Sequence, residues 1–273
     1  MIIAAIQMTS GADVAANLDM AGSLLEEAAT GGAALAALPE NFAFMGLKDA
    51  DKRGVAESDG RGPIQDFLAS TALRLHMTIV GGTIPLRAGA DGRVAAASLV
   101  YGPDGQRTAR YDKIHLFDVD IPGRKETYRE SAHVAPGSAA MVVDTPVGRL
   151  GLSVCYDVRF PELFRTLSAS GAQLLTVPSA FTGPTGQAHW ETLLRARAIE
   201  NLCYVIAPAQ SGFHSNGRET YGDSMIIDYW GRVLQRLPRG RGCVLADIDL
   251  GAQAQVRSNF PALQHRAFAA THS

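Results

Sequence analysis

Residues 150–164 read LGLSVCYDVRFPELF, and the rest of the chain is interpreted outward from this stretch. The apolar run Leu150–Val154 predicts a buried strand, and Cys155 follows it directly, ahead of a polar, proline-punctuated segment. Backbone N–H groups at a helix start favour a thiolate, so this position suits a nucleophile exposed at a sheet edge. The alternative is a buried structural cysteine, because free cysteine is among the most buried residue types.

Two other segments place a charged residue just beyond a strand-like run. Glu40 follows the run Ala34–Leu38, and Pro39 ends regular structure before it. Lys113 follows a short run that leads to Tyr111. A lone charge at such a place is normally solvated surface. However, the ends of strands in one sheet can converge on a single crevice, so an acid, an ammonium and a thiol at three strand ends predict a common site.

The three segments resemble, in their order and separations, the motifs of the nitrilase (carbon–nitrogen hydrolase) superfamily. The matching stretches are PENF at 39–42, YDKIHLFDVDIPG at 111–123 and CYDVRFPEL at 155–163. The resemblance extends from IIAAIQM at 2–8 to NFPALQHR at 259–266. It implies that Glu40, Lys113 and Cys155 form the Glu-Lys-Cys triad of that superfamily.

The pattern of elements agrees with the architecture that the resemblance implies. Strands alternate with a few amphipathic helices, and the turn signals PDG at 103–105 and WGR at 230–232 indicate antiparallel pairs, so the sheets should be mixed. We expect an α/β fold of the nitrilase-like, four-layer αββα type, with two mixed β-sheets flanked by helices in one domain over residues 1–273. The expected strands are Ile2–Met8, Ala33–Leu38, Thr78–Ile84, Val94–Tyr101, Met141–Asp144, Leu150–Val154, Gln173–Val177, Cys203–Pro208, Ser224–Asp228 and Cys243–Ile248, and the expected helices are Asn17–Thr30, Ile64–Leu75, Glu162–Ser170 and Ala188–Asn201.

The composition of the chain limits which binding partners and which cellular compartment are expected. The 273 residues carry 25 Lys and Arg against 27 Asp and Glu, a net charge of −2, so no basic excess points to nucleic acid or to an anionic membrane. The N-terminus lacks the pattern of a signal peptide, and no apolar run approaches the ~20 residues of a membrane helix. An odd count of three cysteines indicates reduced thiols in the cytoplasm, with Cys203 and Cys243 as core residues.

The residue types predict nucleophilic catalysis. An unperturbed thiol has a pKa of about 8.5, so at neutral pH it needs a base or a cation beside it. Glu40 can accept the thiol proton, and the Lys113 ammonium favours the thiolate and later the oxyanion. The backbone N–H of Tyr156 would be the second oxyanion donor. We expect attack on an amide carbon, a thioester on Cys155 and its hydrolysis by water, with no cofactor.

The resemblance also implies a second glutamate between the lysine and a Pro-Gly pair. The spacing of six residues before the proline selects Glu130, because Pro136 follows it at that distance. Glu130 would hold Lys113 by a charge-assisted hydrogen bond or position water. Glu126 is the fallback and otherwise a solvated charge.

The prediction about the substrate rests on Arg159. It lies four residues after Cys155, so the two share a face if a helix begins there. A guanidinium can bind a substrate carboxylate with two hydrogen bonds, although a surface pairing with Asp157 or Glu162 is equally consistent with the spacing. In amidases of this superfamily that act on 2-oxo acids, the arginine of CYDxRFPE resembles a carboxylate clamp.

Segments after the triad resemble the deaminated glutathione amidase branch, whose members release 2-oxoglutarate and cysteinylglycine. They are PSAFTGPTGQAHWETLLRARAIENLCYVIAPAQSGFH and YGDSMIIDYWGRV. The resemblance thus implies a small carboxylate-bearing amide as substrate and a homodimer or higher homo-oligomer. An ω-amidase acting on 2-oxoglutaramate ranks second and a nitrilase third.

The sequence lacks the motifs that are typical of several other enzyme classes. GxSxG, GxxxxGK[ST], GxGxxG, HExxH and paired CxxC patterns are absent, and the seven histidines show no metal-ligand spacing with the cysteines, so no metal site is expected. His115 is interpreted first as a structural hydrogen-bonding residue at the site wall. A papain-like Cys-His protease and a catalytically inactive binding protein on the same fold stay open as alternatives.

Overall fold

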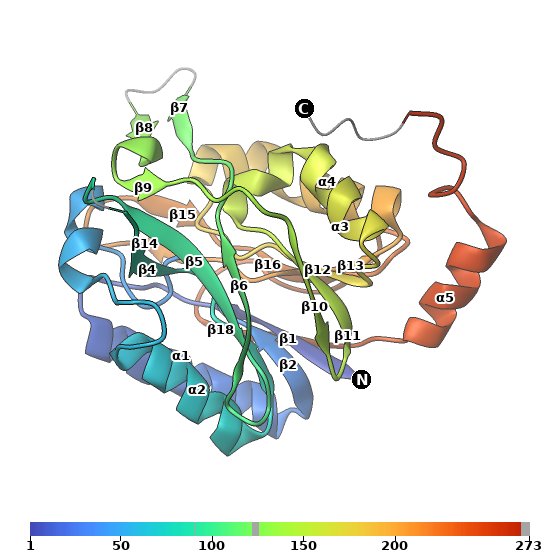
Figure 1. Cartoon of the computed structure of the whole chain (residues 1–273), viewed down its shortest axis with the longest axis horizontal. Coiled ribbons are helices and arrows are strands. Elements are labelled where there is room, and N and C mark those ends of the chain that lie inside the picture. The colour runs from blue at the N-terminus through green and yellow to red at the C-terminus, as the bar shows by residue number, and fades with distance from the viewer. Residues whose placement is uncertain (90, 122–125, 269–273) are drawn as a thin grey trace.

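The computed structural model describes residues 1–89, 91–121 and 126–268. Two β-sheets pack against each other in the middle of the molecule, and helices cover their outer faces (Figure 1). This arrangement confirms the predicted four-layer αββα sandwich. No helix in the described ranges is both long enough and apolar enough to cross a membrane.

The first sheet is built mainly from the N-terminal half of the chain. Its order is β18-β1-β2-β3-β5-β4, and β6 and β9 also pair with β5. The pairs β1–β2 and β2–β3 are parallel, whereas β18 runs antiparallel to β1, so the sheet is mixed as predicted. The strands are β1 (Ile2–Gln7), β2 (Ala33–Ala37), β3 (Thr78–Val80), β4 (Ile84–Arg87), β5 (Val94–Tyr101), β6 (Arg107–Asp112), β9 (Val134–Ala135) and β18 (Gly242–Asp247), and the covering helices are α1 (Val14–Thr30) and α2 (Pro63–Leu75).

The second sheet follows in the chain and is also mixed. Its order is β10-β11-β12-β13-β16-β17, with parallel pairing from β11 to β13 and antiparallel pairing elsewhere. Helices α3 and α4 cover it, and two hairpins and the 3₁₀ turns border the site. The bounds are β10 (Met141–Thr145), β11 (Gly148–Leu152), β12 (Leu174–Thr176), β13 (Tyr204–Ala207), β16 (Ser224–Ile227), β17 (Val233–Leu237), α3 (Pro161–Ala169), α4 (Gly183–Asn201), hairpin β7 (Asp118–Asp120) with β8 (Thr127–Arg129), hairpin β14 (Ser211–Phe213) with β15 (Glu219–Tyr221), η1 (Asp49–Val55), η2 (Glu130–Ala132), η3 (Cys155–Arg159) and α5 (Leu250–Asn259).

Alternation along β1 shows how the first sheet is buried on both faces. Successive side chains of a strand point to opposite faces. Ile3 and Ala5 belong to the core between the sheets, whereas Ala4 and Ile6 belong to the core under α1 and α2. This double burial explains why the strand is a continuous apolar run in the sequence.

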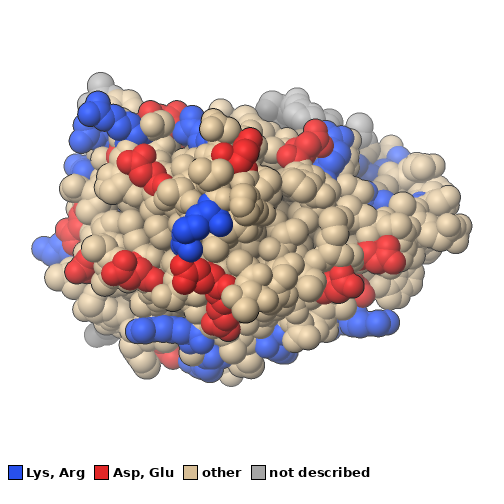
Figure 2. Space-filling view, turned by 90° about the horizontal axis from the view of Figure 1, so that it is seen from below, with Lys and Arg blue, Asp and Glu red and all other residues tan. Residues whose placement is uncertain are grey.

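Helix α1 is capped by a side chain at its start and packs through one buried face. The Asp13 side chain accepts a hydrogen bond from the backbone N–H of Ala16 at 3.2 Å and thereby caps α1. Ala21, Leu25 and Ala28 form the buried stripe of this helix. On the surface that α1 and α2 form, acidic and basic side chains are interspersed (Figure 2).

The predicted strand Thr78–Ile84 is two strands, and glycine explains the break. Gly82 adopts a φ of +46°, and a Cβ there would lie 2.0 Å from the carbonyl oxygen of Pro39. Only glycine allows this close approach, which brings the chain next to Glu40. The sequence prediction also omitted the strands β6 and β17 and the helix α5.

Candidate active site

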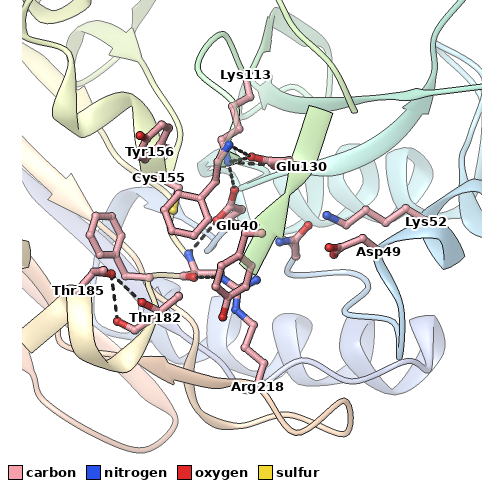
Figure 3. A pocket seen from close by; sticks show the side chains of 15 residues that line it. Glu40, Asp49, Lys52, Lys113, Glu130, Cys155, Tyr156, Thr182, Thr185 and Arg218 are labelled. Atoms are coloured by element: carbon pink, nitrogen blue, oxygen red, sulfur yellow. Dashed lines mark hydrogen bonds and ion pairs between the residues drawn. The ribbon is translucent and has the colours of Figure 1, made fainter. Parts of the chain in front are cut away.

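Chain segments from both sheets meet at one cavity (Figure 3). Its empty volume, including the open mouth, is about 520 Å³. The residues that line it are Glu40, Asn41, Asp49, Lys52, Lys113, Phe117, Tyr128, Glu130, Cys155, Tyr156, Ala180, Phe181, Thr182, Thr185 and Arg218. The four residues expected to carry the chemistry, which are Glu40, Lys113, Glu130 and Cys155, are therefore brought together in one cavity.

Cys155 lies in a tight turn between β11 and α3. Its φ is +48°, in the left-handed region that non-glycine residues rarely adopt, and its backbone N–H donates to the carbonyl of Pro178 at 2.9 Å. The residue is 7% exposed, so the expectation of a thiol exposed at a sheet edge is wrong. The strand ends inside the sandwich, which places the thiol at the bottom of the cavity.

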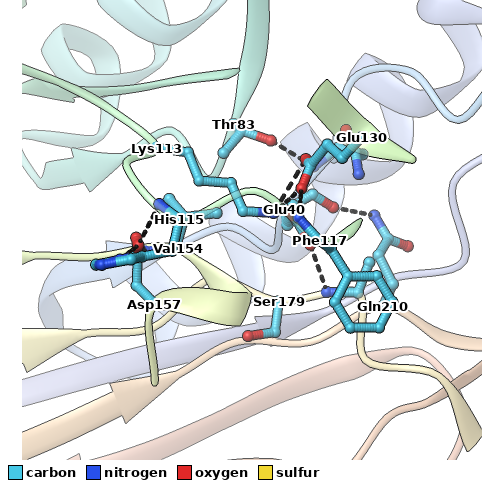
Figure 4. Close-up of polar contacts among 12 residues, drawn as sticks. Glu40, Thr83, Lys113, His115, Phe117, Glu130, Val154, Asp157, Ser179 and Gln210 are labelled. Carbon is cyan, nitrogen blue, oxygen red and sulfur yellow. Dashed lines mark hydrogen bonds and ion pairs between the residues drawn. The ribbon is translucent and has the colours of Figure 1, made fainter. Parts of the chain in front are cut away.

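A buried carboxylate holds this turn in place (Figure 4). Asp157 is fully buried, and its Oδ2 accepts hydrogen bonds from the Val154 N–H at 2.8 Å and the Tyr111 hydroxyl at 2.7 Å. Its Oδ1 is 3.0 Å from the backbone nitrogen and 2.7 Å from the ring Nδ1 of His115. His115 also stacks on Phe160, with ring centroids 3.7 Å apart. These contacts agree with the structural interpretation of His115.

Glu40 follows β2 and points into the cavity. It is 4% exposed, and its Oε1 accepts a hydrogen bond from Lys113 Nζ at 2.8 Å. Its Oε2 accepts one from the backbone N–H of Ala180 at 2.9 Å, and its carbonyl accepts one from Gln210 Nε2 at 3.1 Å. Both carboxylate oxygens are thus fixed, one by each half of the sandwich.

Lys113 follows β6 and is enclosed by two carboxylates. Its Nζ lies 3.0 and 2.9 Å from the two oxygens of Glu130, and the Phe117 N–H donates to Glu130 Oε2 at 2.7 Å. Glu130, rather than Glu126, therefore accompanies the lysine. Glu126 Oε2 instead accepts a hydrogen bond from the Tyr128 hydroxyl at 3.1 Å. The end of the lysine motif, Pro122 and Gly123, lies outside the described residues.

The charges in this cluster follow from burial and pairing. Burial raises the pKa of Glu40, but the charge and hydrogen bond of Lys113 outweigh burial and hold the pKa below its ordinary value of 4.5. Burial lowers the pKa of Lys113, but Glu130 and Glu40 together hold it well above 10.5. Burial, followed by the Glu40 charge, raises the pKa of the Cys155 thiol far above 9.0 despite the Lys113 ammonium. The resting site thus holds a protonated thiol beside an ionised carboxylate, and the expectation that its surroundings favour a thiolate is wrong.

Two further predicted groups lie close to Cys155 in the sequence, the backbone N–H of Tyr156 and the side chain of Arg159. Among the described residues, the backbone N–H of Tyr156 has no backbone acceptor. Arg159 shares the turn η3 with Cys155, and its guanidinium carbon lies 5.8 and 5.6 Å from the ring centroids of Tyr156 and Phe181, which both line the cavity. Its Nη1 and Nη2 are each 3.3 Å from His189 Nδ1.

The other two cysteines differ from each other. Cys203 is fully buried, and Arg257 Nη2 lies 3.1 Å from its sulfur, as expected for a core position. Cys243 is half-buried and packs against the core under α1 and α2, so it lies at the margin of the core rather than inside it as expected. It lies on β18, the outermost strand of its sheet, which among the described residues pairs by hydrogen bonds with β1 on one side only.

Sequence reasoning missed the cationic wall of the cavity. Lys52 comes from η1 and Arg218 from the hairpin β14–β15. Neither element has the periodicity of a strand or long helix, so the sequence gives no signal that these residues reach the site. In the part of the chain that the structure describes, no cluster of three or more His, Cys, Asp or Glu side chains could hold a metal ion, and no histidine lines the cavity.

Comparisons with known proteins agree with this geometry. The carbon–nitrogen hydrolase family model matches residues 2–258. The deaminated glutathione amidase of Synechocystis sp. is 46% identical over 270 residues, which cover 98% of both chains. A Saccharomyces cerevisiae member of branch 10 of the nitrilase superfamily superimposes with a TM-score of 0.88 at 29% identity, covering 98% of this chain and 97% of that chain.

A third relative bears on the chemistry. A mutant of the amidase from Nesterenkonia sp. AN1 has a TM-score of 0.81 at 27% identity, with 98% of this chain and 94% of that chain covered. In that structure the acetamide moiety of fluoroacetamide is covalently added at the active site cysteine. The chain described here therefore belongs to the carbon–nitrogen hydrolase family, within the nitrilase superfamily, and is an amidase.

Proposed function

We propose that this amidase hydrolyses the amide bond of a small 2-oxo acid amide that carries a carboxylate, with deaminated glutathione as the first candidate. The products would be 2-oxoglutarate and cysteinylglycine. The observation that carries the proposal is the cluster of buried Glu40 and Lys113 with the partly buried Glu130, which lies beside Cys155 in one cavity. The substrate is suggested by relatives named deaminated glutathione amidase, one of which is 46% identical over 98% of this chain.

The first step begins from a neutral thiol. Glu40 takes the Cys155 proton as Sγ attacks the amide carbon, so no free thiolate has to exist in the resting enzyme. The low pKa of Glu40 keeps it ionised at neutral pH and ready to accept that proton. The carbonyl π-electrons move onto the oxygen, which becomes the oxyanion of a tetrahedral intermediate.

Two donors would stabilise that oxyanion. The Tyr156 N–H follows the nucleophile directly, and Lys113 supplies a buried positive charge. In the resting site Lys113 Nζ is bonded to Glu40 and to both oxygens of Glu130, so it must redirect one of these hydrogen bonds toward the oxyanion. The role of Glu130 is to hold the ammonium while this exchange occurs.

The intermediate then breaks down in two stages. Glu40 returns its proton to the leaving nitrogen as the C–N bond breaks, which leaves a thioester on Cys155 and a free amine. Glu40 next accepts a proton from water, whose oxygen attacks the thioester carbon. Breakdown of the second intermediate returns the proton to Sγ and releases the carboxylic acid. No cofactor takes part in this sequence.

Arg159 is proposed to bind the carboxylate of the acyl half. It lies against the rings of Tyr156 and Phe181, so it is adjacent to the cavity on the side of the nucleophile. In the resting structure the Arg159 guanidinium contacts His189 Nδ1, and a substrate carboxylate would replace this contact. An ω-amidase acting on 2-oxoglutaramate would use the same residues and ranks second. A nitrilase ranks third, because a simple nitrile has no carboxylate for Arg159.

The setting of the enzyme is proposed from the sequence resemblance. We place it in the cytoplasm as a homodimer or higher homo-oligomer acting without nucleic acid or membrane partners. The Cys-His alternative has little support, because His115 is held by Asp157 and Phe160 away from the cavity-lining set.

The test compares substrates and one variant. We expect kcat/KM to be highest for deaminated glutathione, followed by 2-oxoglutaramate, and far lower for a simple nitrile or a carbamoyl amino acid. Mass spectrometry during turnover should find the acyl adduct on Cys155 and on neither Cys203 nor Cys243. Arg159→Ala should raise KM for 2-oxo acid amides, because each hydrogen bond to a charged group contributes about 1.5–3 kcal/mol. Equal losses on a carboxylate-free amide would remove the clamp role of Arg159.

A further inference from the structure

Two cations that line the cavity, Lys52 and Arg218, form no ion pair with a carboxylate among the residues that the structure describes. The Lys52 side chain makes no hydrogen bond or ion pair within the described part of the chain, although its charge contributes to the lowered pKa of Glu40. Arg218 donates from Nη2 to the Ala180 carbonyl and lies over the ring of Tyr128, 5.2 Å from its centroid. Its Nε is buried and has no acceptor among the described residues. A buried donor without an acceptor is costly, so an anion that reaches this wall would gain a hydrogen bond that the resting protein does not supply.

These cations lie apart from the position of Arg159. In Figure 3, Lys52 and Asp49 enter the cavity on the side opposite Tyr156, and Arg218 enters from below. Arg159 packs against Tyr156, so the cationic groups stand on two sides of the nucleophile. A substrate that spans the site can therefore meet a positive charge at each end.

The wall also has room for a large leaving group. A second, outer depression shares Tyr128 and Arg218 with the active-site cavity and continues toward Asn216 and Phe213. Arg218 thus lies where the inner cavity opens into this depression. Asp49 lies beside Lys52 and adds a hydrogen-bond acceptor. The Asp49 carboxylate can accept from the N–H groups of a peptide end, and the Lys52 ammonium can bind its carboxylate.

We propose that Lys52 and Arg218 form a subsite for a carboxylate on the leaving amine, so that the enzyme prefers amides of peptide-like amines to primary amides. The inference rests on the proposed function and goes beyond it, because it assigns the leaving-group half of the substrate to named residues. A charge-assisted hydrogen bond from a guanidinium is stronger and more directional than one from a neutral donor. The subsite would hold the leaving amine near Glu40, which must protonate it.

The experiment uses three substrates with one 2-oxoglutaryl half. They are deaminated glutathione, its analogue with the terminal carboxylate converted to a carboxamide, and 2-oxoglutaramate, whose leaving group is ammonia. We measure kcat/KM for each with wild type, Arg218→Gln, Arg218→Lys, Lys52→Gln and the control Lys48→Gln, which removes an exposed lysine outside the cavity. The readout is the ratio of kcat/KM for deaminated glutathione to that for each other substrate, because a ratio is independent of the folded fraction.

We expect wild type to favour the carboxylate form over its carboxamide about tenfold or more, the equivalent of one hydrogen bond to a charged group. Arg218→Gln and Lys52→Gln should each reduce that ratio several-fold, mainly through KM, and Arg218→Lys should restore part of it. Lys48→Gln should keep the wild-type ratio.

Unchanged ratios in Arg218→Gln and Lys52→Gln would overturn the subsite. Failure of the proposed function is a different result, in which wild type hydrolyses none of the three substrates, and this would overturn the subsite as well. If wild type cleaves all three with equal kcat/KM, hydrolysis of 2-oxo acid amides stands, whereas the leaving-group subsite and the ranking of deaminated glutathione above 2-oxoglutaramate are both overturned.

Discussion

The Cys155 sulfur is protonated in the resting site because burial and the Glu40 charge both raise its pKa above 9.0. We expect the ultraviolet thiolate absorbance of wild type minus that of Cys155→Ser to stay at zero from neutral pH up to pH 9.0. A folded-state pKa raised above the unfolded value favours the protonated form, so ionisation begins only above 9.0. A titration step near neutral pH in this difference would contradict the general-base role of Glu40.

Lys113 is held between the buried carboxylate of Glu40 and the partly buried carboxylate of Glu130, so its removal should affect both rate and stability. We expect Lys113→Met to lower kcat about 10²-fold or more, the usual effect of losing one oxyanion donor. The variant also leaves the Glu40 and Glu130 carboxylates together without a cation, which should raise the pKa of Glu40 and destabilise the fold. Steady-state kinetics and urea unfolding measure the two effects.

Lys48→Met is the matched control for Lys113→Met, because Lys48 is exposed and outside the cavity. It should change neither kcat nor the urea midpoint. A near-normal kcat in Lys113→Met would take the lysine out of the mechanism and return attention to a Cys-His pair.

At the scale of elements, the turn η3 depends on one carboxylate. Asp157 accepts hydrogen bonds from Val154, Tyr111 and His115 and so fixes the strained φ of Cys155. We expect Asp157→Asn to lower kcat tenfold or more with little change in KM, because the sulfur moves while the binding walls stay. The free energy of unfolding should fall by about 1–3 kcal/mol, since buried donors lose their charged acceptor.

Tyr111→Phe is the milder variant of the same network. It removes one donor but keeps the Asp157 charge, so its effect on kcat should be much smaller than that of Asp157→Asn. Equal kcat values for wild type and Asp157→Asn would show that the turn is held by the backbone alone.

The elements that the sequence predicted well are those with strong periodicity. The strand Val94–Tyr101 has the predicted bounds because it is apolar throughout and buried on both faces. The strand β6 was missed because its sequence, RTARYD, is polar and only Ala109 and Tyr111 are buried. The helix α5 was missed because it buries only Gln253, so it lacks an apolar stripe.

The site was predictable to the extent that its residues occur in local motifs. Glu40, Lys113, Glu130 and Cys155 follow recognisable strand ends or spacings and do meet in the structure. The depth of Cys155 was not predictable, because burial depends on how the second sheet packs against the first. Lys52 and Arg218 could not be predicted, since a turn and a hairpin bring them to the cavity only in three dimensions.

At the scale of the whole molecule, an exposed apolar patch bears on assembly. Ile199, Trp230 and Phe260 are 48%, 57% and 53% exposed, and the rings of Trp230 and Phe260 are 5.7 Å apart. Such patches often mark interfaces between protein chains. We expect sedimentation velocity to give a mass of at least twice the 28.9 kDa chain, and Trp230→Glu to shift it toward the monomer.

An exposed aromatic elsewhere provides the control for this assembly test. Phe213→Glu changes a side chain that is 73% exposed on the hairpin β14–β15, away from Trp230 in the chain. Its sedimentation should match that of wild type. A wild-type sedimentation coefficient in Trp230→Glu would exclude this patch as the interface.

The pairing of β18 with β1 has a consequence for how the enzyme matures on the ribosome. Residues 2–7 are synthesised long before their partner strand at 242–247. Until that strand emerges, β1 presents an open edge, and the sheet that carries Glu40 and Lys113 is incomplete. The open edge of β1 is therefore a place where a chaperone would have to protect the nascent chain from pairing with other chains.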